Sequence, residues 1–368
     1  MVAGKRLAAA VLCLLAALPV LAASPAAASL TGAEIVHLLS LQREANGIPG
    51  GLSERTDWST GCAKHNYYEE QTGEFGHEED PSSPYYSEEG DWAAHNSVIA
   101  YGSSWGEGNP WEDAPIHLLQ MLAPQMSETG AAESYGRNCL TTWPGYKRPS
   151  PATLTPYSYP GNGVTGVVPE EYAAESPFIP GDFVGLPEGT ATGRYLLAYL
   201  SGAFGYAEAA KVTATATLSG PAGPVDLRTI DSTSSDIGAF MPPPSAFLIP
   251  AQPLQPLAGY QADVKWAMAG VPLYEQRFSF TTGARQGEGA PAAKKAIAPC
   301  KRLIRTVRHL RHRASKLKAR GTDLVRTGTS KAKRRLGSHL LALAAQLKAK
   351  ARHRARQARR CGTRPGSS

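Results

Sequence analysis

The sequence lacks the short motifs that mark common nucleotide-binding, metalloprotease and paired-cysteine sites. No G-x-x-x-x-G-K-[ST], H-E-x-x-H or paired C-x-x-C pattern occurs in its 368 residues. A single G-x-S-x-G match, GSSWG at residues 102–106, is not preceded by a predicted strand, so a serine nucleophile has no support beyond this short pattern. Basic residues are also missing from residues 76–100, a stretch that holds two histidines and six carboxylates.

Long apolar runs are absent after the first 28 residues. Residues 1–28 combine Lys5 and Arg6 with an apolar run and end in three alanines before Ser29. This arrangement is typical of a secretory signal peptide. An uncleaved anchor is the alternative, but the run is short for a membrane span. We therefore expect a secreted, extracellular protein with no transmembrane segment once the leader is removed.

Cysteine is scarce, and one of the five cysteines, Cys13, leaves with the leader. The other four form an even set, as expected in an oxidising compartment. Four cysteines allow three pairings. Their spacing favours Cys62–Cys139 and Cys300–Cys361, each within its own part of the chain.

Charge divides the mature chain into an acidic body and a basic end. Residues 29–283 hold 11 Lys/Arg against 29 Asp/Glu, a balance of −18, whereas residues 284–368 hold 25 against 2, a balance of +23. Such asymmetry predicts that the basic end meets an anionic partner. Its lack of aromatic stacking groups argues against sequence-specific nucleic-acid binding, and leaves wall polymers, lipid headgroups, extracellular DNA or the acidic body itself. A solvated segment without a ligand is the simpler alternative.

The length of the mature chain exceeds that of a single core and predicts two or three domains. In the first part, the patterns predict helices over 31–46, 58–71 and 91–100, a helix that begins at Pro115 with Asp113 as its cap, and a strand within 129–143. Residues 145–180 look like a connector. Between 182 and 282, short β-type runs recur about every ten residues, which favours an antiparallel β-sandwich.

The basic end contains two stripes of leucine and alanine at helical spacing, separated by Gly321 and Gly328. Cys300 opens the first stripe and Cys361 closes the second, so a bridge would staple an antiparallel helical hairpin. The expected organisation is a signal peptide (1–28), an α/β domain (29–148), a connector and Ig-like β-sandwich (149–283), a linker (284–297), a basic α-helical hairpin (298–362) and a tail (363–368).

Residues 32–143 resemble the CAP superfamily of cysteine-rich secretory, antigen 5 and pathogenesis-related proteins, in its bacterial secreted, SCP-like form. The resemblance rests on the order and spacing of IVHLLSLQREANGIPGGL, CAKHNYYEE, FGHEEDP, DWAAHNSVIA and DAPIHLLQMLAP followed by TGAAES. It implies an α+β fold with a CAP-type α–β–α sandwich and a shallow cleft that holds two histidines and two acidic residues. In some relatives the histidines bind a divalent metal such as zinc.

By position, His77 and His117 match the two cleft histidines of the family. The segment Ala94-His95-Asn96 stands where the family has Gly-Glu-Asn, so His95 replaces the glutamate and Asn96 remains. This departure removes one cleft carboxylate. The second family acid is not placed by position, and Glu78, Glu79, Glu88 and Glu89 are all candidates.

Three imidazoles that converge on one point would suit zinc better than two and would leave one coordination position open. The hypothesis is thus a metal site formed by His77, His95 and His117, with a carboxylate such as Glu78 available to orient one ring. The alternative is a set of hydrogen-bonded cleft histidines without metal. His65, on a tyrosine-rich helix, is expected to be structural, and the acidic loop to be a solvated surface rather than a Ca²⁺ site.

Two functions follow from this interpretation. The first is a secreted, non-enzymatic CAP-domain protein that binds a metal or small ligand in the cleft and is held at an anionic cell-surface or cell-wall polymer by residues 298–362. The second is a metal-dependent hydrolase of a cell-wall or extracellular substrate that uses His77, His95 and His117.

Overall fold

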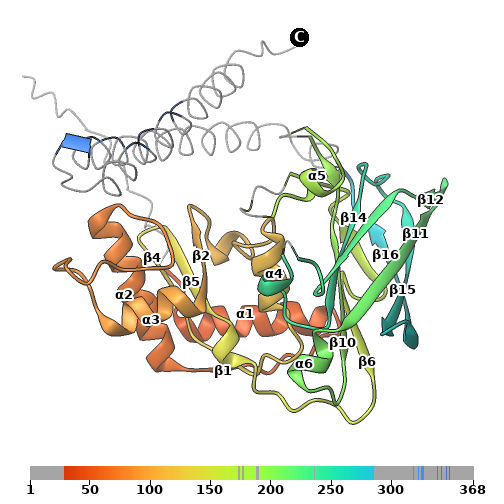
Figure 1. The fold of residues 1–368 in the computed structure, drawn as a ribbon, viewed down its shortest axis with the longest axis horizontal. Coiled ribbons are helices and arrows are strands. Elements are labelled where there is room, and N and C mark those ends of the chain that lie inside the picture. Colours follow the sequence, from red (N-terminus) through yellow and green to blue (C-terminus); the bar gives the residue numbers. More distant parts are fainter. Residues whose placement is uncertain are drawn as a thin grey trace, which may run out of the picture.

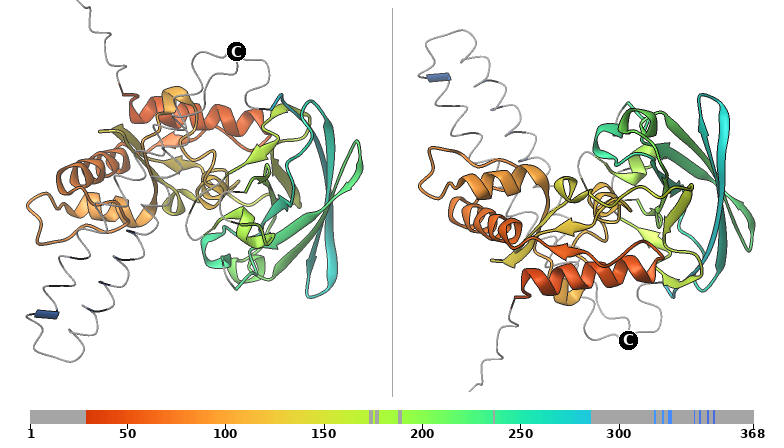
Figure 2. Two further views of the ribbon diagram at one scale, coloured as in Figure 1. Left: turned by 90° about the horizontal axis from the view of Figure 1, so that it is seen from above. Right: turned by 90° about the horizontal axis from the view of Figure 1, so that it is seen from below.

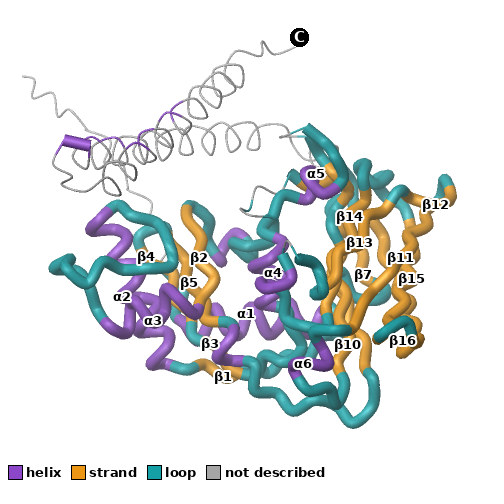
Figure 3. The backbone as a smooth tube through the Cα atoms, in the orientation of Figure 1, coloured by secondary structure: helices purple, strands orange, loops and turns teal. Residues whose placement is uncertain are grey.

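The computed structural model describes residues 29–285, except 173, 174, 176, 177, 188, 189 and 236, together with the isolated residues 318, 322, 325, 326, 338, 341, 345 and 348. The predicted signal peptide, most of the predicted basic hairpin and the predicted Cys300–Cys361 bridge lie outside the described residues. Figure 1 shows a helix-rich part built from α1 to α4 beside a strand-rich part, and Figure 3 shows the same division by secondary structure.

The helix-rich part, which we call the α/β unit, contains a small antiparallel sheet. Its strands lie in the order β2-β5-β4, and a short parallel pair, β1 and β3, accompanies them. The elements are α1 (Gly32–Ala45), β1 (Ser53–Glu54), α2 (Thr56–Thr72), α3 (Glu88–Asn96), β2 (Ser97–Tyr101), η1 (Trp105–Glu107), α4 (Pro115–Met121), β3 (Glu128–Thr129), β4 (Ala131–Ser134), β5 (Arg137–Thr141) and η2 (Trp143–Gly145).

Local sequence explains where several of these helices begin and end. Thr31 and Glu34 form the predicted capping box at the start of α1, and α2 ends at Gly73, whose φ of 68° is left-handed. The prediction of a helix over 91–100 is wrong in its second half, because α3 ends at Asn96 and the chain passes directly into β2. The run SVIAY is rich in residues that favour strands, and pairing with β5 fixes it as one.

The small sheet is covered by helices on both faces. Ile99, Ala132 and Cys139 pack with Cys62 of α2 and Ala93 of α3 on one face. The other face packs toward α1 and α4, through residues such as Val98, Leu140, Leu39 and Leu119. Alternation of side chains along each strand sends neighbours to opposite faces, so the unit has helix–sheet–helix layering. Membership of the CAP superfamily stays a prediction.

The strand-rich part consists mainly of two packed sheets, in the orders β13-β14-β10-β6 and β12-β11-β15-β16-β7, with β8 and β9 forming a separate pair. Pairing is antiparallel except between β16 and β7. The elements are β6 (Thr155–Tyr159), β7 (Val164–Val167), β8 (Glu170–Glu171), α5 (Pro180–Phe183), β9 (Thr192–Gly193), β10 (Leu196–Ser201), α6 (Tyr206–Ala209), β11 (Val212–Gly220), β12 (Gly223–Val225), β13 (Leu227–Asp231), η3 (Gly238–Phe240), β14 (Ser245–Pro250), β15 (Gly259–Met268) and β16 (Val271–Thr282).

This β-sandwich, as we call it, extends further toward the N-terminus than the sequence suggested. The segment 145–180, expected to be a connector, contributes β6 to one sheet and β7 to the other. Figure 2 shows the two sheets stacked at one side of the molecule. The coarse prediction of an α+β chain with antiparallel sheets is confirmed, and the Ig-like type of the sandwich stays a prediction.

The four-stranded sheet is buried on both faces. In β10, Leu196 and Ala198 point toward the five-stranded sheet, and the alternate residues Leu197 and Tyr199 belong to the core that also contains Leu39 of α1. This double burial explains why β10 and β14 read as continuous apolar runs. The α/β unit and the β-sandwich therefore share one hydrophobic core. Residues on both sides of the predicted boundary at 148/149 belong to that core.

Candidate functional site

The loop between α2 and α3 carries His77 and is fixed from beneath by a buried histidine, His65. Both His65 and Glu79 have fully buried side chains, and His65 Nδ1 lies 3.0 Å from Glu79 Oε1. His65 Nε2 lies 3.1 Å from the carbonyl oxygen of Gly76. Because an acceptor faces each nitrogen, the doubly protonated ring can donate to both. His65 therefore ties down the chain on either side of His77.

The His65–Glu79 pair retains a proton. Burial alone would lower the pKa of His65, but the hydrogen bonds and charges of Glu69 and Glu79 outweigh burial, and the net pKa is raised. Burial also raises the pKa of Glu79, although the hydrogen bond from His65 opposes it. We assign the proton to His65, because acceptors face both of its nitrogens. The predicted structural role of His65 fits this arrangement.

Three further hydrogen bonds hold the backbone of the same loop to side chains of α2 and α3. They join Gly76 N to Glu69 Oε1 (3.1 Å), Glu79 N to Asp91 Oδ1 (2.9 Å) and Asp80 N to Tyr68 Oη (2.8 Å). The loop is polar and largely exposed, yet its backbone is fixed at several points around His77. Such anchoring pre-positions a side chain for binding.

His77 lies on the exposed side of this anchored loop. Its Nδ1 is 2.8 Å from the carbonyl oxygen of Ala94, near the end of α3. A ring nitrogen that faces a carbonyl oxygen carries the proton, so the neutral ring has its lone pair on Nε2. Among the described residues, none forms a hydrogen bond with that Nε2.

His117 lies in the first turn of α4, where it meets a carboxylate from the β-sandwich side of the chain. Glu175 follows β8, and its carboxylate accepts hydrogen bonds from Ile116 N (2.6 Å) and His117 N (3.1 Å). The same carboxylate contacts His117 Nδ1. Glu175 thus replaces the predicted cap, Asp113, because the N-cap position is Ala114 and offers no side-chain acceptor.

Burial is the main influence on the pKa of the His117 ring. Burial, with a smaller contribution from the charge of His77, lowers the pKa of His117 to about 3. The negative charge of Glu175 acts on this pKa in the opposite direction. His117 Nδ1 lies against the Glu175 carboxylate without a hydrogen bond of regular geometry, and a carboxylate at this nitrogen favours the neutral form that is protonated there. The lone pair then lies on Nε2, as in His77.

The two histidines lie side by side. Their ring centroids are 6.4 Å apart, and the ring planes differ by 14°. The resemblance predicted that His77 and His117 share a site, and the structure brings these two rings together. With a Zn–N distance of about 2.0–2.1 Å, the centres of two imidazoles in a tetrahedral site lie roughly 5 Å apart. A shared metal would therefore require the rings to approach by about 1 Å.

The other residues predicted for the cleft do not join this pair. His95 is exposed, and its Nδ1 lies 2.8 Å from the carbonyl oxygen of Asp91, one turn back on α3. Asn96 similarly donates to the carbonyl oxygen of Trp92 at 2.8 Å. Glu78 is exposed and makes no described contact with either histidine. Both polar side chains at the end of α3 thus bind their own helix.

The predicted three-histidine metal site is consequently not assembled. Over residues 29–285 and the isolated residues described beyond them, no group of three or more His, Cys, Asp or Glu side chains is arranged to hold a metal ion. The physical reason is the position of His95 on the solvent side of α3. A pair, His77 and His117, remains.

The acidic residue beside the histidine pair is none of the four glutamates proposed from the sequence, Glu78, Glu79, Glu88 and Glu89. Glu79 is buried against His65, Glu89 pairs with Lys64 at 3.0 Å, and Glu88 is exposed. None of these three contacts His77 or His117 in the described part of the chain. The acid that does so is Glu175, 58 residues after His117. No local signal in the sequence pointed to Glu175, because Asp113 was predicted to cap α4.

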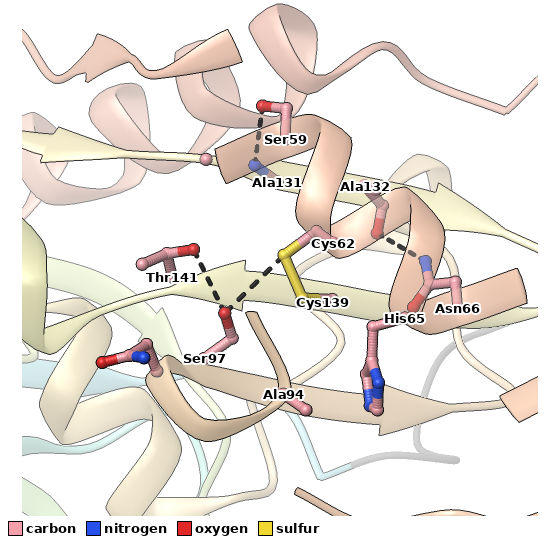
Figure 4. Close-up of a disulfide and its surroundings, with 12 residues drawn as sticks. Ser59, Cys62, His65, Asn66, Ala94, Ser97, Ala131, Ala132, Cys139 and Thr141 are labelled. Atoms are coloured by element: carbon pink, nitrogen blue, oxygen red, sulfur yellow. Dashed lines mark hydrogen bonds between the residues drawn. A yellow bond between two sulfur atoms is a disulfide. The ribbon is translucent and has the colours of Figure 1, made fainter. Parts of the chain in front are cut away.

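The predicted Cys62–Cys139 disulfide is confirmed and holds the helical side of the site to the sheet. It joins α2 to β5, with the two Cα atoms 5.3 Å apart. Figure 4 shows Ser97 beside it, where the hydroxyl lies 3.7 Å from Cys62 Sγ and 3.1 Å from Thr141 Oγ1. The bridge therefore fixes α2 against the sheet. His65, which supports the loop that carries His77, lies on the same helix.

Two hollows lined by described residues lie away from the histidine pair. One, of about 460 Å³, is at an edge of the β-sandwich beside Tyr260 and Phe280. The other, of about 320 Å³, follows α1 beside His37 and Ser40. Neither is lined by His77 or His117. No helix in the described part of the chain is long and apolar enough to cross a membrane.

Comparison with known proteins does not assign a family. No family model matches the chain, and no curated protein matches it. Among solved structures, the methionine-rich copper resistance protein PcoC of Escherichia coli is 16% identical, with 34% of this chain and 92% of that chain covered and a TM-score of 0.20. Its selenomethionine form is 17% identical, with 34% and 94% covered and a TM-score of 0.19. Likeness at this level supports no conclusion.

Proposed function

We propose that the protein is a secreted, non-enzymatic CAP-type protein that binds a divalent metal ion, such as Zn²⁺, or a small ligand between His77 and His117. The observation that carries this proposal is the state of the two rings. Each has an acceptor at Nδ1 and no described partner at Nε2. With the two ring centroids 6.4 Å apart, we infer that one ligand contacts both Nε2 atoms.

The partners at Nδ1 are those that metal-binding histidines use. A histidine that binds a metal through one nitrogen generally donates its other N–H to a carboxylate or a backbone carbonyl, which fixes the ring and raises its basicity. His117 has the Glu175 carboxylate in this position, and His77 has the carbonyl of Ala94. Neutral imidazole nitrogens suit zinc and other late transition metals. The chemistry of these donors therefore suits such an ion once the rings approach by about 1 Å, with water or a ligand in the remaining positions.

The experiment is a Zn²⁺ titration of the purified protein by equilibrium dialysis, with three histidine variants. We expect H77A and H117A each to abolish saturable binding. H95A is the matched control, because His95 is exposed and bonded to its own helix, and we expect it to leave the Zn²⁺ affinity unchanged. Wild-type protein that binds no Zn²⁺ would overturn the metal proposal. Loss of binding in H95A would replace the pair by the three-histidine site.

The alternative function, a metal-dependent hydrolase, has less support than metal binding. An open position on zinc activates water best when three protein ligands hold the ion. Only two histidines meet at the candidate site, since His95 faces solvent.

We further propose that the protein is exported and that its basic end, residues 298–362, holds it at an anionic surface polymer or at lipid headgroups. The Cys62–Cys139 disulfide supports export, because such bridges persist in oxidising compartments. The balance of +23 over residues 284–368 supports the electrostatic role. This segment lies almost entirely outside the described residues, and its charge alone supports the proposal.

A further inference from the structure

The candidate site is completed by a residue from outside the α/β unit. His77 and His117 both belong to that unit, whereas Glu175 lies between β8 and α5, in the β-sandwich part of the chain. Only 4% of the Glu175 side chain is exposed. Its carboxylate accepts from two amides of α4 and contacts the His117 ring. The orientation of His117, which belongs to the α/β unit, thus depends on the Glu175 carboxylate, which belongs to the β-sandwich part of the chain.

An arginine fixes both chain segments that meet at this point. Arg194 is buried at the start of β10, with 3% of its side chain exposed, and its Nη2 donates to Glu112 Oε1 at 2.7 Å. Its Nη1 contacts the Glu171 carboxylate. Glu112 precedes His117 by five residues, and Glu171 precedes Glu175 by four. A single guanidinium therefore holds the segment that leads to His117 and the segment that leads to Glu175.

Further contacts hold α4 to the β-sandwich. Tyr195 Oη donates to the carbonyl oxygen of Glu112 at 2.7 Å, and Tyr199 Oη donates to that of Leu119 at 2.9 Å. Gln120 Nε2 donates to the carbonyl oxygen of Phe240 at 2.9 Å. These donors come from both sides of the contact. The helix that carries His117 is thus joined to the β-sandwich by several hydrogen bonds.

We propose that Glu175 is a positioning residue for the histidine pair, and that metal binding at His77 and His117 is thereby coupled to the docking of the β-sandwich on α4. The coupling rests on the proposed metal function. The positioning role of Glu175 does not rest on that function, because Glu175 sets the position of the proton on His117 with or without a metal. Linkage requires reciprocity: whatever weakens the Glu175 contact weakens metal binding, and metal binding strengthens the contact.

The test combines two measurements on wild type, E175Q and E170Q. Glu175→Gln keeps the size of the side chain but removes the charge that selects the Nδ1–H form. Loss of such an orienting partner typically weakens metal affinity by about 10–100-fold, and we expect a loss of that size for Zn²⁺. Glu170→Gln is the control: this residue is in the same segment and lies 3.8 Å from Arg285, and we expect no change.

The second measurement is the protonation of the His117 ring in metal-free protein, read from ¹⁵N–¹H NMR correlations of the imidazole. We expect the Nδ1–H form in wild type and in E170Q, and its loss in E175Q. The two outcomes are separable. If wild type binds no Zn²⁺ but the ring changes in E175Q, the metal function fails and Glu175 keeps its positioning role. If wild type binds Zn²⁺ and E175Q matches it in both affinity and ring form, the positioning inference is overturned.

Discussion

Arg43 is a deeply buried cation whose partners are all backbone carbonyls. It lies in the last turn of α1, and its side chain is inaccessible to solvent. The guanidinium donates to the carbonyl oxygens of Pro49 (2.9 Å), Met121 (2.7 Å), Ala123 (3.0 Å) and Met126 (3.4 Å). Three of these acceptors belong to the end of α4 or follow it, where carbonyl groups lack partners within the helix. Burial lowers the pKa of Arg43 to about 10, so the group remains charged at pH 7.

Replacing Arg43 by methionine retains an apolar stem of similar length and removes every donor. Ala123 O and Met126 O keep other donors, from Met126 N and Arg148. The carbonyl oxygens of Pro49 and Met121 have no other described partner. Each buried acceptor left unpaired costs about 1–3 kcal/mol, and release of a buried guanidinium offsets part of this. We therefore expect R43M to lower the free energy of unfolding by about 2–5 kcal/mol.

The assay is urea unfolding at pH 7, followed by intrinsic fluorescence, with R55M as control. Arg55 is half-buried and pairs with Asp57 at 2.9 Å and with Glu128 at 3.3 Å, and ion pairs near the surface contribute roughly 0–1 kcal/mol each. The R43M transition should shift to lower urea with an unchanged slope. A shift no larger than that of R55M would refute the reasoning, because it would mean that the carbonyls find other donors at no cost.

Two further predictions concern a buried acid and the basic end. Burial raises the pKa of Glu171 to about 7, against the opposing charge of Arg194, so the native state binds more protons than the unfolded state between about pH 4.5 and 7. The stability that this group contributes therefore falls as the pH rises through that window. Urea unfolding of wild type and E171Q between pH 5 and 8 should show the free energy of unfolding of wild type falling relative to that of E171Q. A difference that stays constant with pH would contradict the prediction. For the basic end, retention on an anionic matrix should fall steeply with salt and vanish when the chain is truncated after residue 283, and a truncated chain that is still retained would rule out the electrostatic role.

The sequence predicted those features that depend on nearby residues. The capping box of Thr31 and Glu34 was readable because both partners lie within one turn. The strands of the β-sandwich were readable because alternation and turn residues are local signals. The Cys62–Cys139 pairing was predicted from the spacing of the four cysteines and is confirmed.

Features that depend on distant contacts were not readable. The end of α3 at Asn96 is decided by pairing of the next five residues with β5. The strands β6 and β7 lie in a Pro/Gly-rich stretch whose order comes from the sheets they join. His95 has the residue type of a ligand, but its place on α3 turns it to solvent. Glu175 gives no motif, because its role arises only when a segment 58 residues away packs beside it.

The doubly buried sheet has a consequence for how the protein is made. If the leader directs export as predicted, the chain is delivered with its N-terminus first, and α1 and α4 emerge with apolar faces that match Leu197 of β10 and Phe247 of β14. Until Phe247 has crossed, those faces have nothing to pack against, since their partners are still on the other side of the membrane. The α/β unit would spend that interval with its core open, exposed to extracellular proteases and to other incomplete chains. Completion of the histidine site would then be among the last events of folding, because Glu175 comes into place only with the sandwich.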